Sequence, residues 1–276
     1  MRIPAYAKVN LALDILGSRK DGKHDMDMVN ARVSLCDILD IEESDQDEIV
    51  CETMKLPAVN TLSKTLEKLR EHGLQKHYKI RLLKNIPEKA GLGGGSADAA
   101  ALLVALNEME DLQLSLEELE AIGFEIGADV PCCLHTGYTR VSGAGEHVRD
   151  LDVKWSIPVI IVQSAHGIST KEAFEAYDLH PERPLDVGIV SDAVRKKDIG
   201  LLYQTMTNAF ENQAFERHAE LGELKEDMQD AGLVRVMMSG SGSALMGFSV
   251  DDDVLSEAYE HLKERYPFVW KGTIGL

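Results

Sequence analysis

The most informative stretch of the sequence is PEKAGLGGGSADAA at residues 87–100. Glycine fills four of the five positions from Gly91 to Gly95. Glycine adopts backbone angles that other residues avoid, and it lets an anion approach the chain closely. The alanine- and leucine-rich segment 96–108 predicts a helix, whose first turn offers unpaired N–H groups and a positive dipole end. We therefore expect a phosphate-binding loop formed by Pro87, Ala90, Gly91, Leu92, Gly93, Gly94, Gly95, Ser96 and Ala97.

Two common phosphate-binding motifs do not fit this loop. A Walker A loop needs Gly-Lys-Ser or Gly-Lys-Thr after the glycines, and no such triplet follows here. A dinucleotide-binding fingerprint needs a third glycine where Ser96 stands. Ser96 can touch a phosphate or a magnesium ion, or it can cap the helix. A tight strand-to-helix turn without a ligand is the structural alternative, and one or two glycines would suffice for it.

A second glycine turn, SGSGS at 239–243, lies between two apolar segments that predict strands, 234–238 and 244–248. This turn can simply connect the two strands of a hairpin. Beside the first loop it can also close over the same phosphates. The sequence leaves both interpretations open.

Lys8 and Asn10 lie in a roughly alternating apolar segment, 2–16, which predicts a strand. Residues two apart in a strand point to the same face, so both side chains can meet one substrate. A lysine in an apolar strand is unfavourable unless it is paired or faces a cleft. Asp129 is a carboxylate that can orient a hydroxyl and accept its proton, or it can be an ordinary turn residue.

The remaining pattern mixes helices and strands without a regular β-α-β alternation, which favours an α+β fold. Ser115 and Glu118 form a capping box at the start of a predicted helix over 114–127. Further expected strands are 33–42, 48–52, 78–84, 138–141, 157–163 and 268–274. Further expected helices are 60–72, 170–177, 186–197, 198–207, 216–231 and one capped by Asp251 or Asp252.

Composition and charge exclude several classes of function. The net charge of −18 repels the phosphates of nucleic acids, so we expect no nucleic-acid partner. No apolar run has the length of a membrane span or of a signal peptide core, so we expect a cytoplasmic protein without a membrane partner. The four cysteines are expected to be free thiols, and the nine histidines show no metal-ligand spacing.

These motifs together resemble the GHMP small-molecule kinases, and the resemblance covers nearly the whole chain. The triple-glycine loop and the Gly-Ala-Asp-Val-Pro run at 127–131 are its specific motifs, whereas the turn at 239–243 alone is not specific. The segments that carry the resemblance are 5–11 (AYAKVNL), 17–26 (GSRKDGKHDM), 87–100, 126–131 (IGADVP), 208–211 (NAFE) and 238–243 (MSGSGS).

The resemblance implies two α+β domains, 1–155 and 156–276, with the active site in the cleft between them. It also implies ATP with Mg²⁺ and phosphorylation of a substrate hydroxyl, with Asp129 as base and Lys8 paired with it. Within the family the chain is similar to members that act on a cytidine diphosphate-linked polyol in non-mevalonate isoprenoid biosynthesis. We expect a small-molecule substrate and a monomer or homodimer. The substrate-binding residues are then Asn10, Lys23, His24, Phe174, Gly240, Ser241 and Gly242.

The chain departs from the family pattern mainly where the base of the substrate is recognised. Lys23 stands where the family has a tyrosine that stacks on cytosine, while Phe174 occupies the place of the second stacking aromatic. Met28 replaces a small polar residue, and Ala97 replaces a serine of the glycine loop. A kinase for another small alcohol and a non-catalytic ATP-binding paralogue are therefore the alternatives. Asn60 and Lys84 are candidates for contact with adenine, by position alone.

Overall fold

The computed structural model describes residues 1–181 and 184–276. In this described part, eleven strands form one hydrogen-bonded sheet that contains the path β3-β4-β2-β11-β7-β10-β9. The strands are β1 (Arg2–Ser18), β2 (His24–Ser44), β3 (Glu48–Cys51), β4 (His77–Leu83), β5 (Tyr138–Gly143), β6 (His147–Asp150), β7 (Ile157–Gln163), β8 (Thr207–Asn208), β9 (Arg235–Met238), β10 (Leu245–Phe248) and β11 (Phe268–Ile274). The helices are α1 (Thr61–Glu71), α2 (Gly94–Met109), α3 (Leu116–Ile126), α4 (Val130–Cys133), α5 (Thr170–Leu179), α6 (Val187–Lys196), α7 (Ile199–Thr205), α8 (Glu211–Arg217), α9 (Ala219–Asp230) and α10 (Asp252–Lys263).

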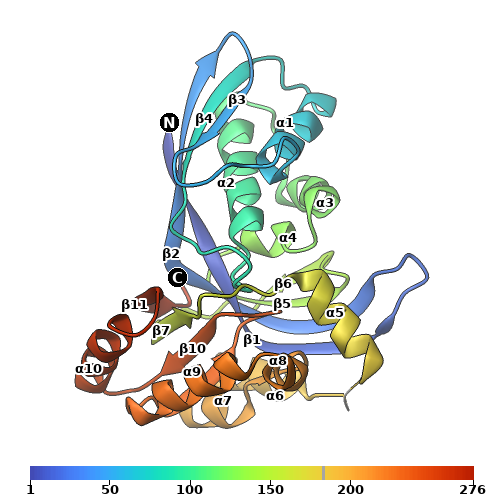
Figure 1. Ribbon diagram of the computed structural model, residues 1–276. Helices are drawn as coiled ribbons and strands as arrows, with labels where there is room; N and C mark the ends of the chain where they lie inside the picture. Colours follow the sequence, from blue (N-terminus) through green and yellow to red (C-terminus); the bar gives the residue numbers. More distant parts are fainter. Residues whose placement is uncertain (182–183) are drawn as a thin grey trace.

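Two long strands hold the molecule together. β1 has 17 residues and β2 has 21, and they pair antiparallel from Arg2↔Asp40 to Ser18↔His24. β2 also pairs with β4 at its far end and with β5 near its start. Helices α1 to α4 lie beside the upper end of these strands (Figure 1). The lower part contains β7, β9, β10 and β11 with helices α5 to α10 (Figure 1).

The hydrophobic core continues from one part to the other. One cluster of buried side chains contains Val9 of β1 and Leu102 of α2 together with Ile157 of β7 and Met246 of β10. β11 joins the two parts of the sheet because it pairs with β7 along its length and with β2 at Ile274↔Val33. The mixed helices and strands confirm the predicted α+β class. The domain boundary between 155 and 156 stays a prediction, and it precedes β7 by one residue.

Most expected elements are confirmed, and the differences have local causes. The capping box of Ser115 and Glu118 is present at the start of α3, and Asp251 caps α10. The single helix expected over 216–231 is wrong, because the chain breaks at His218 into α8 and α9. The strand expected to begin at 33 begins at His24, because β1 and β5 both pair with its first residues. Among the helices of the described part, none combines the length and apolar character of a membrane span.

Candidate active site

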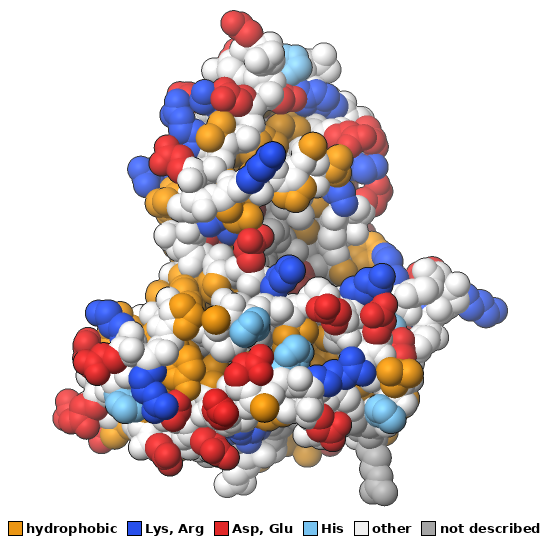
Figure 2. Space-filling view, viewed as in Figure 1, with side chains coloured by type: hydrophobic (Ala, Val, Ile, Leu, Met, Phe, Trp, Pro, Cys, Tyr) orange, Lys and Arg blue, Asp and Glu red, His pale blue; other side chains and the backbone are white. Residues whose placement is uncertain are grey.

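A cavity of about 1030 Å³ lies between the two parts of the molecule. Figure 2 shows the waist between these parts, with charged and histidine side chains mixed over the lower part. The lining includes residues of β1 and β2, the segment 54–62, the start of α2, the segment before α4, α5 and the turn after β9. Of the expected site residues, the lining contains Lys8, Lys23, His24, Pro87, Ala90, Gly91, Leu92, Gly93, Gly94, Gly95, Ser96, Asp129, Phe174, Gly240 and Ser241.

The glycine loop is held against β1 at the base of this cavity. The backbone N–H of Lys8 donates to the carbonyl of Leu92 at 3.0 Å, which fixes the loop beside the lysine. Gly93 is the N-cap of α2 in the left-handed region at φ 68°, and a methyl group there would lie 3.0 Å from Cγ of Lys8. The helix begins at Gly94, so Ser96 lies inside its first turn and is not the N-cap. Gly94, Gly95 and Ser96 bring the N-terminus of the 16-residue helix to the cavity, where it favours an anion.

The second glycine turn, 239–243, packs against the glycine loop. The Ser239 hydroxyl donates to the carbonyl of Gly91 at 3.1 Å, and the N–H of Ala244 donates to the carbonyl of Ala90 at 3.2 Å. The turn therefore connects β9 to β10 and also closes one side of the glycine loop, while its expected contact with the phosphates stays a prediction. Asn208 holds the turn in place, because its side-chain amide donates to the carbonyls of Met238 and Gly240 at 2.8 Å each.

Two of the expected residues in these loops lie behind the cavity lining. Ala97 is buried in the first turns of α2. Gly242 faces inward, where an added methyl group would lie 2.6 Å from the sulfur of Met238. Their backbones support the loops, while their neighbours meet the cavity.

Lys8 and Asp129 form an ion pair at the cavity wall, with 3.4 Å between Nζ and Oδ2. The lysine side chain is 8% exposed and the aspartate side chain is 38% exposed, so the carboxylate is the group that solvent or substrate reaches. Asp129 is the N-cap of α4 but makes no side-chain capping bond, which leaves its carboxylate directed at Lys8. Burial disfavours the charged ammonium, but Asp129 and the neighbouring Cys132 and Cys133 together favour it more strongly, so the pKa of Lys8 is raised. Lys8 therefore stays protonated at neutral pH.

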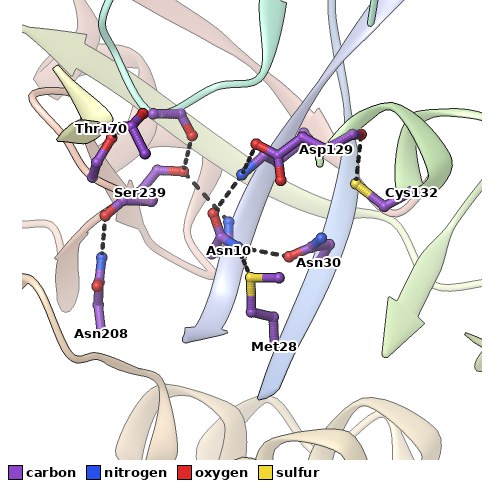
Figure 3. Close-up of polar contacts among 12 residues, drawn as sticks. Asn10, Met28, Asn30, Asp129, Cys132, Thr170, Asn208 and Ser239 are labelled. Carbon is purple, nitrogen blue, oxygen red and sulfur yellow. Dashed lines mark hydrogen bonds and ion pairs between the residues drawn. The ribbon is translucent and has the colours of Figure 1, made fainter. Parts of the chain in front are cut away.

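Asn10 lies behind Lys8 and away from the cavity surface. Its side chain is fully buried, and its Oδ1 accepts a hydrogen bond from Nζ of Lys8 at 2.8 Å. Its Nδ2 donates to Oδ1 of Asn30 at 2.7 Å (Figure 3). The expected contact between Asn10 and substrate stays a prediction, and in this structure the amide supports Lys8.

The far end of the cavity is aromatic. The rings of His24 and Phe174 stack with centroids 4.4 Å apart and planes 14° apart, and Phe174 also meets Phe210 edge-on. His24 Nε2 lies 2.8 Å from Oδ1 of Asp178, the next turn of α5 beyond Phe174. Lys23 turns away from this stack, with its Nζ 4.0 Å from the ring centroid of Phe124 on α3. Met28 also lines the cavity.

A buried ionic triad beneath the glycine loop could not be recognised in the sequence. Lys84 at the end of β4 bonds the carboxylates of Asp37 and Asp98, the latter at 3.0 Å. A methyl group on Gly94 would lie 3.1 Å from Nζ of Lys84, so the triad directly supports the start of α2. Burial raises the pKa of Asp98 to about 7, against the opposing charge of Lys84.

The triad also bears on the two adenine candidates. The Lys84 ammonium is engaged by two carboxylates, which opposes the adenine contact expected from its position alone. Asn60 lines the cavity and caps α1, where its side chain accepts from the N–H of Ser63. All four cysteines are free thiols. Within residues 1–181 and 184–276, no group of three or more His, Cys, Asp and Glu side chains could hold a metal ion by itself.

Comparison with known families gives two matches along the chain. Residues 60–137 match the model of the GHMP kinases N terminal domain, and residues 190–267 match that of the GHMP kinases C terminal region. Together these segments include the glycine loop, Asp129 and the second glycine turn.

Full-length relatives are similar over nearly their whole length. The chain is 38% identical to the 4-diphosphocytidyl-2-C-methyl-D-erythritol kinase of Chloroherpeton thalassium, with 96% of this chain and 95% of that protein covered. It is 34% identical to the enzyme of the same name from Clostridium beijerinckii, with 98% of both covered. A crystal structure of 4-(cytidine 5'-diphospho)-2C-methyl-D-erythritol kinase superimposes with a TM-score of 0.83 at 31% identity, with 100% of both chains covered. The homoserine kinase of Cytophaga hutchinsonii shares the fold, with a TM-score of 0.71, 20% identity, and 98% of this chain and 94% of that chain covered.

Proposed function

The chain belongs to the GHMP kinases, and from that premise we propose that it transfers a phosphoryl group from ATP to a hydroxyl of 4-diphosphocytidyl-2-C-methyl-D-erythritol. The observation that carries the proposal is the Lys8–Asp129 ion pair, which lies at the wall of the same cavity as the glycine loop. The relatives that cover the whole chain bear the name of this activity. The reaction then belongs to isoprenoid biosynthesis.

Each group at the cavity has a physical role in such a transfer. The start of α2 and the glycine loop offer N–H donors and a positive dipole end to the phosphates of ATP. The Asp129 carboxylate orients the substrate hydroxyl and accepts its proton. The Lys8 ammonium pairs with the Asp129 carboxylate and stabilises negative charge that develops on the transferred group. Phosphoryl transfer depends on such positioning and electrostatics more than on covalent participation of the protein.

Magnesium fits this site as a partner of the nucleotide. Mg²⁺ is usually held by one or two carboxylates together with substrate phosphates and water, not by a cage of protein ligands. The donor set suits that mode, because Asp129 and Ser96 both line the cavity at the glycine loop. When bound, the ion neutralises charge on the phosphates, and Asp129 and Ser96 are the residues that would face it.

The aromatic end of the cavity suits the cytosine ring. Phe174 offers one ring face, and His24 beside it offers a second aromatic surface in place of the tyrosine that Lys23 replaces. Aromatic side chains bind nucleobases by stacking, which is worth about 1–3 kcal/mol per base. We also propose, from the enzymes it resembles, that the protein works in the cytoplasm as a monomer or homodimer.

A coupled assay of ADP release with Mg-ATP tests the proposal. The substrates compared are 4-diphosphocytidyl-2-C-methyl-D-erythritol, homoserine, mevalonate, phosphomevalonate and simple sugars. We expect turnover on the order of 1 s⁻¹ or faster with the cytidine substrate and little with the others. Turnover with another alcohol alone would reassign the substrate, and ATP binding without turnover would indicate a non-catalytic paralogue.

A variant of Phe174 tests the base-binding end separately. We expect Phe174→Ala to raise the KM of the cytidine substrate about tenfold, the equivalent of one lost stacking contact, with little change in the KM of ATP. Phe215→Ala is the matched control, because Phe215 on α8 is also partly buried but lies outside the cavity lining. Equal increases in the KM of the cytidine substrate in the two variants would mean that the cytosine ring binds elsewhere.

A further inference from the structure

Asn30 lies behind the catalytic pair, one residue further from the cavity than Asn10. It is on β2, directly opposite Asn10 on β1, and its side chain is 2% exposed. Figure 3 shows its amide directed at that of Asn10, and the bond from Nδ2 of Asn10 to Oδ1 of Asn30 is 2.7 Å long. Asn30 itself does not line the cavity, so it can affect a reaction there only through its neighbours.

The amide of Asn10 can support Lys8 in one orientation only. The Lys8 ammonium donates hydrogen bonds and accepts none, so Asn10 must turn its Oδ1 toward Nζ. Rotation of the amide by 180° would place an NH₂ group against the ammonium. The orientation therefore depends on what accepts the Nδ2 protons at the other end of the amide.

Asn30 is the strong acceptor at that end. The other neighbour of Asn10 Nδ2 is the thioether sulfur of Met28 at 3.5 Å, and a thioether is a weak acceptor. The Oδ1 of Asn30 therefore decides which way the Asn10 amide faces. Through that amide it holds the Lys8 ammonium between Asn10 at 2.8 Å and Asp129 at 3.4 Å.

The other end of the Asn30 amide is left without a partner. Its Nδ2 is buried and has no hydrogen-bond acceptor among the described residues. Asn30 also lines a cavity of about 10 Å³, roughly the room that a single water molecule needs. A buried donor without a partner is unfavourable, so an apolar side chain would suit packing better at this position. The bond to Asn10 is the feature that an apolar side chain could not supply.

We propose that Asn30 is a positioning residue, whose carbonyl orients the Asn10 amide and thereby holds the Lys8 ammonium beside Asp129. This inference rests on the proposed kinase function for its kinetic readout. Its structural readout, the place of the Lys8 ammonium, is independent of the substrate.

Asn30→Leu removes the acceptor, and Asn30→Asp keeps an acceptor oxygen in the same place. We expect Asn30→Leu to lower kcat about tenfold, the equivalent of one hydrogen bond, with the KM of ATP changed less than about twofold. We expect Asn30→Asp to keep most of the activity. Ser34→Ala is the control on the same strand, because Ser34 bonds Thr273 and neither residue lines the cavity, so it should leave kcat unchanged. An unchanged kcat in Asn30→Leu would overturn the proposal, as would equal losses in the Leu and Asp variants.

A double-mutant cycle separates positioning from a general loss of stability. If Asn30 acts through Asn10, then Asn30→Leu should change kcat by less than about twofold in an Asn10→Ala background. A loss as large as in the wild-type background would overturn the proposal. The alkaline limb of the kcat/KM profile should also move to lower pH in Asn30→Leu, because the ammonium loses a hydrogen bond that favours its charged form.

Crystal structures of the wild type and Asn30→Leu keep the test separate from the choice of substrate. We expect the variant to show the Lys8 Nζ displaced from the Asn10 side chain. An unchanged Lys8–Asn10 contact overturns the inference even if the cytidine substrate is turned over. If the wild type does not phosphorylate this substrate, only the proposed function is contradicted. The position of Lys8 in the variant then still shows whether Asn30 is a positioning residue.

Discussion

At the scale of single residues, the site is a set of side chains whose roles differ by how deeply each is buried. Asp129 is partly exposed and can meet a substrate hydroxyl, whereas Lys8 is nearly buried and meets the carboxylate from behind. Asn10 and Asn30 are both buried, and Asn10 accepts a hydrogen bond from Lys8 while it donates one to Asn30. We therefore expect Asp129 to be the reactive group and the residues behind it to hold its partner Lys8 in position.

Replacement of Asp129 by asparagine tests that assignment. We expect Asp129→Asn to lower kcat by about 10²–10⁴, because an amide cannot accept the proton of the hydroxyl. ATP binding, measured by calorimetry, should remain within about threefold of the wild type. Asp192→Asn is the control, since this exposed aspartate of α6 lies outside the cavity lining. A wild-type rate in Asp129→Asn would remove this residue from the chemistry.

At the scale of elements, the glycine loop is supported from two sides by segments that are distant in sequence. The turn after β9 contacts it from one side, and the triad of Lys84, Asp37 and Asp98 lies beneath the start of α2. Gly91 is at φ 74°, and an added methyl group would lie 1.9 Å from the carbonyl oxygen of Ser239. The loop thus needs glycine here for two reasons, its backbone angle and this close approach.

Two alanine variants separate these reasons. Gly91→Ala should lower the thermal midpoint and raise the KM of ATP, because the turn after β9 must move away from the loop. Gly22→Ala introduces alanine at a similar φ of 82° but meets nothing within 4 Å, so it should cost only the left-handed backbone penalty of about 1–2 kcal/mol. Similar thermal midpoints in the two variants would mean that the close approach at Gly91 does not affect stability.

The triad predicts a pH dependence of stability. The pKa of Asp98 is about 7 in the folded protein, against an ordinary value of 3.8 for an aspartate in the unfolded chain. Between these two pH values the folded protein therefore holds a proton that the unfolded chain has lost. The contribution of Asp98 to the free energy of unfolding is therefore greatest below about pH 4 and falls as the pH rises toward 7.

Asp98→Asn removes this contribution. As the pH rises from 4 to 7, the free energy of unfolding of the wild type should therefore fall relative to that of the variant by an amount on the order of 2 kcal/mol. Urea unfolding at several pH values measures the difference. Asp45→Asn, at an exposed turn, is the control that should follow the wild type. A difference that does not vary with pH would mean that Asp98 keeps an ordinary pKa.

The sequence predicts the parts of the site that are local. The glycine loop, the capping box at Ser115 and most helices and strands depend on residues a few positions apart, and they are confirmed. Contacts between distant segments have no such signal. Lys84 lies 47 positions from Asp37, and His24 lies 154 positions from Asp178. The pairing of Lys8 with Asp129 could be expected only through the family resemblance, because no local pattern joins them.

At the scale of the whole molecule, the cavity lies between two parts that share strands and a core. β1 and β2 run through the junction, and β11 pairs with strands of both parts. The core cluster includes buried residues from both sides of position 155. The two parts should therefore lose their structure together, in spite of the boundary that the sequence predicts there.

Equilibrium unfolding in urea tests this expectation. Far-UV circular dichroism reports on helices of both parts, and tryptophan fluorescence reports on Trp155 and Trp270, which both pack against the shared core. We expect the two signals to give one coincident transition, as for a single cooperative unit. Separate transitions would instead support independent domains at 1–155 and 156–276.

The contacts between the glycine loop and the turn after β9 also set an order of events during protein synthesis. The loop leaves the ribosome about 150 residues before Ser239 and Ala244, the partners of its carbonyls. Chains are made at about 5–20 residues per second, so the loop spends seconds outside the ribosome without that support. A nascent or truncated chain that ends before residue 244 lacks part of this support, so we expect it to bind ATP more weakly than the full chain.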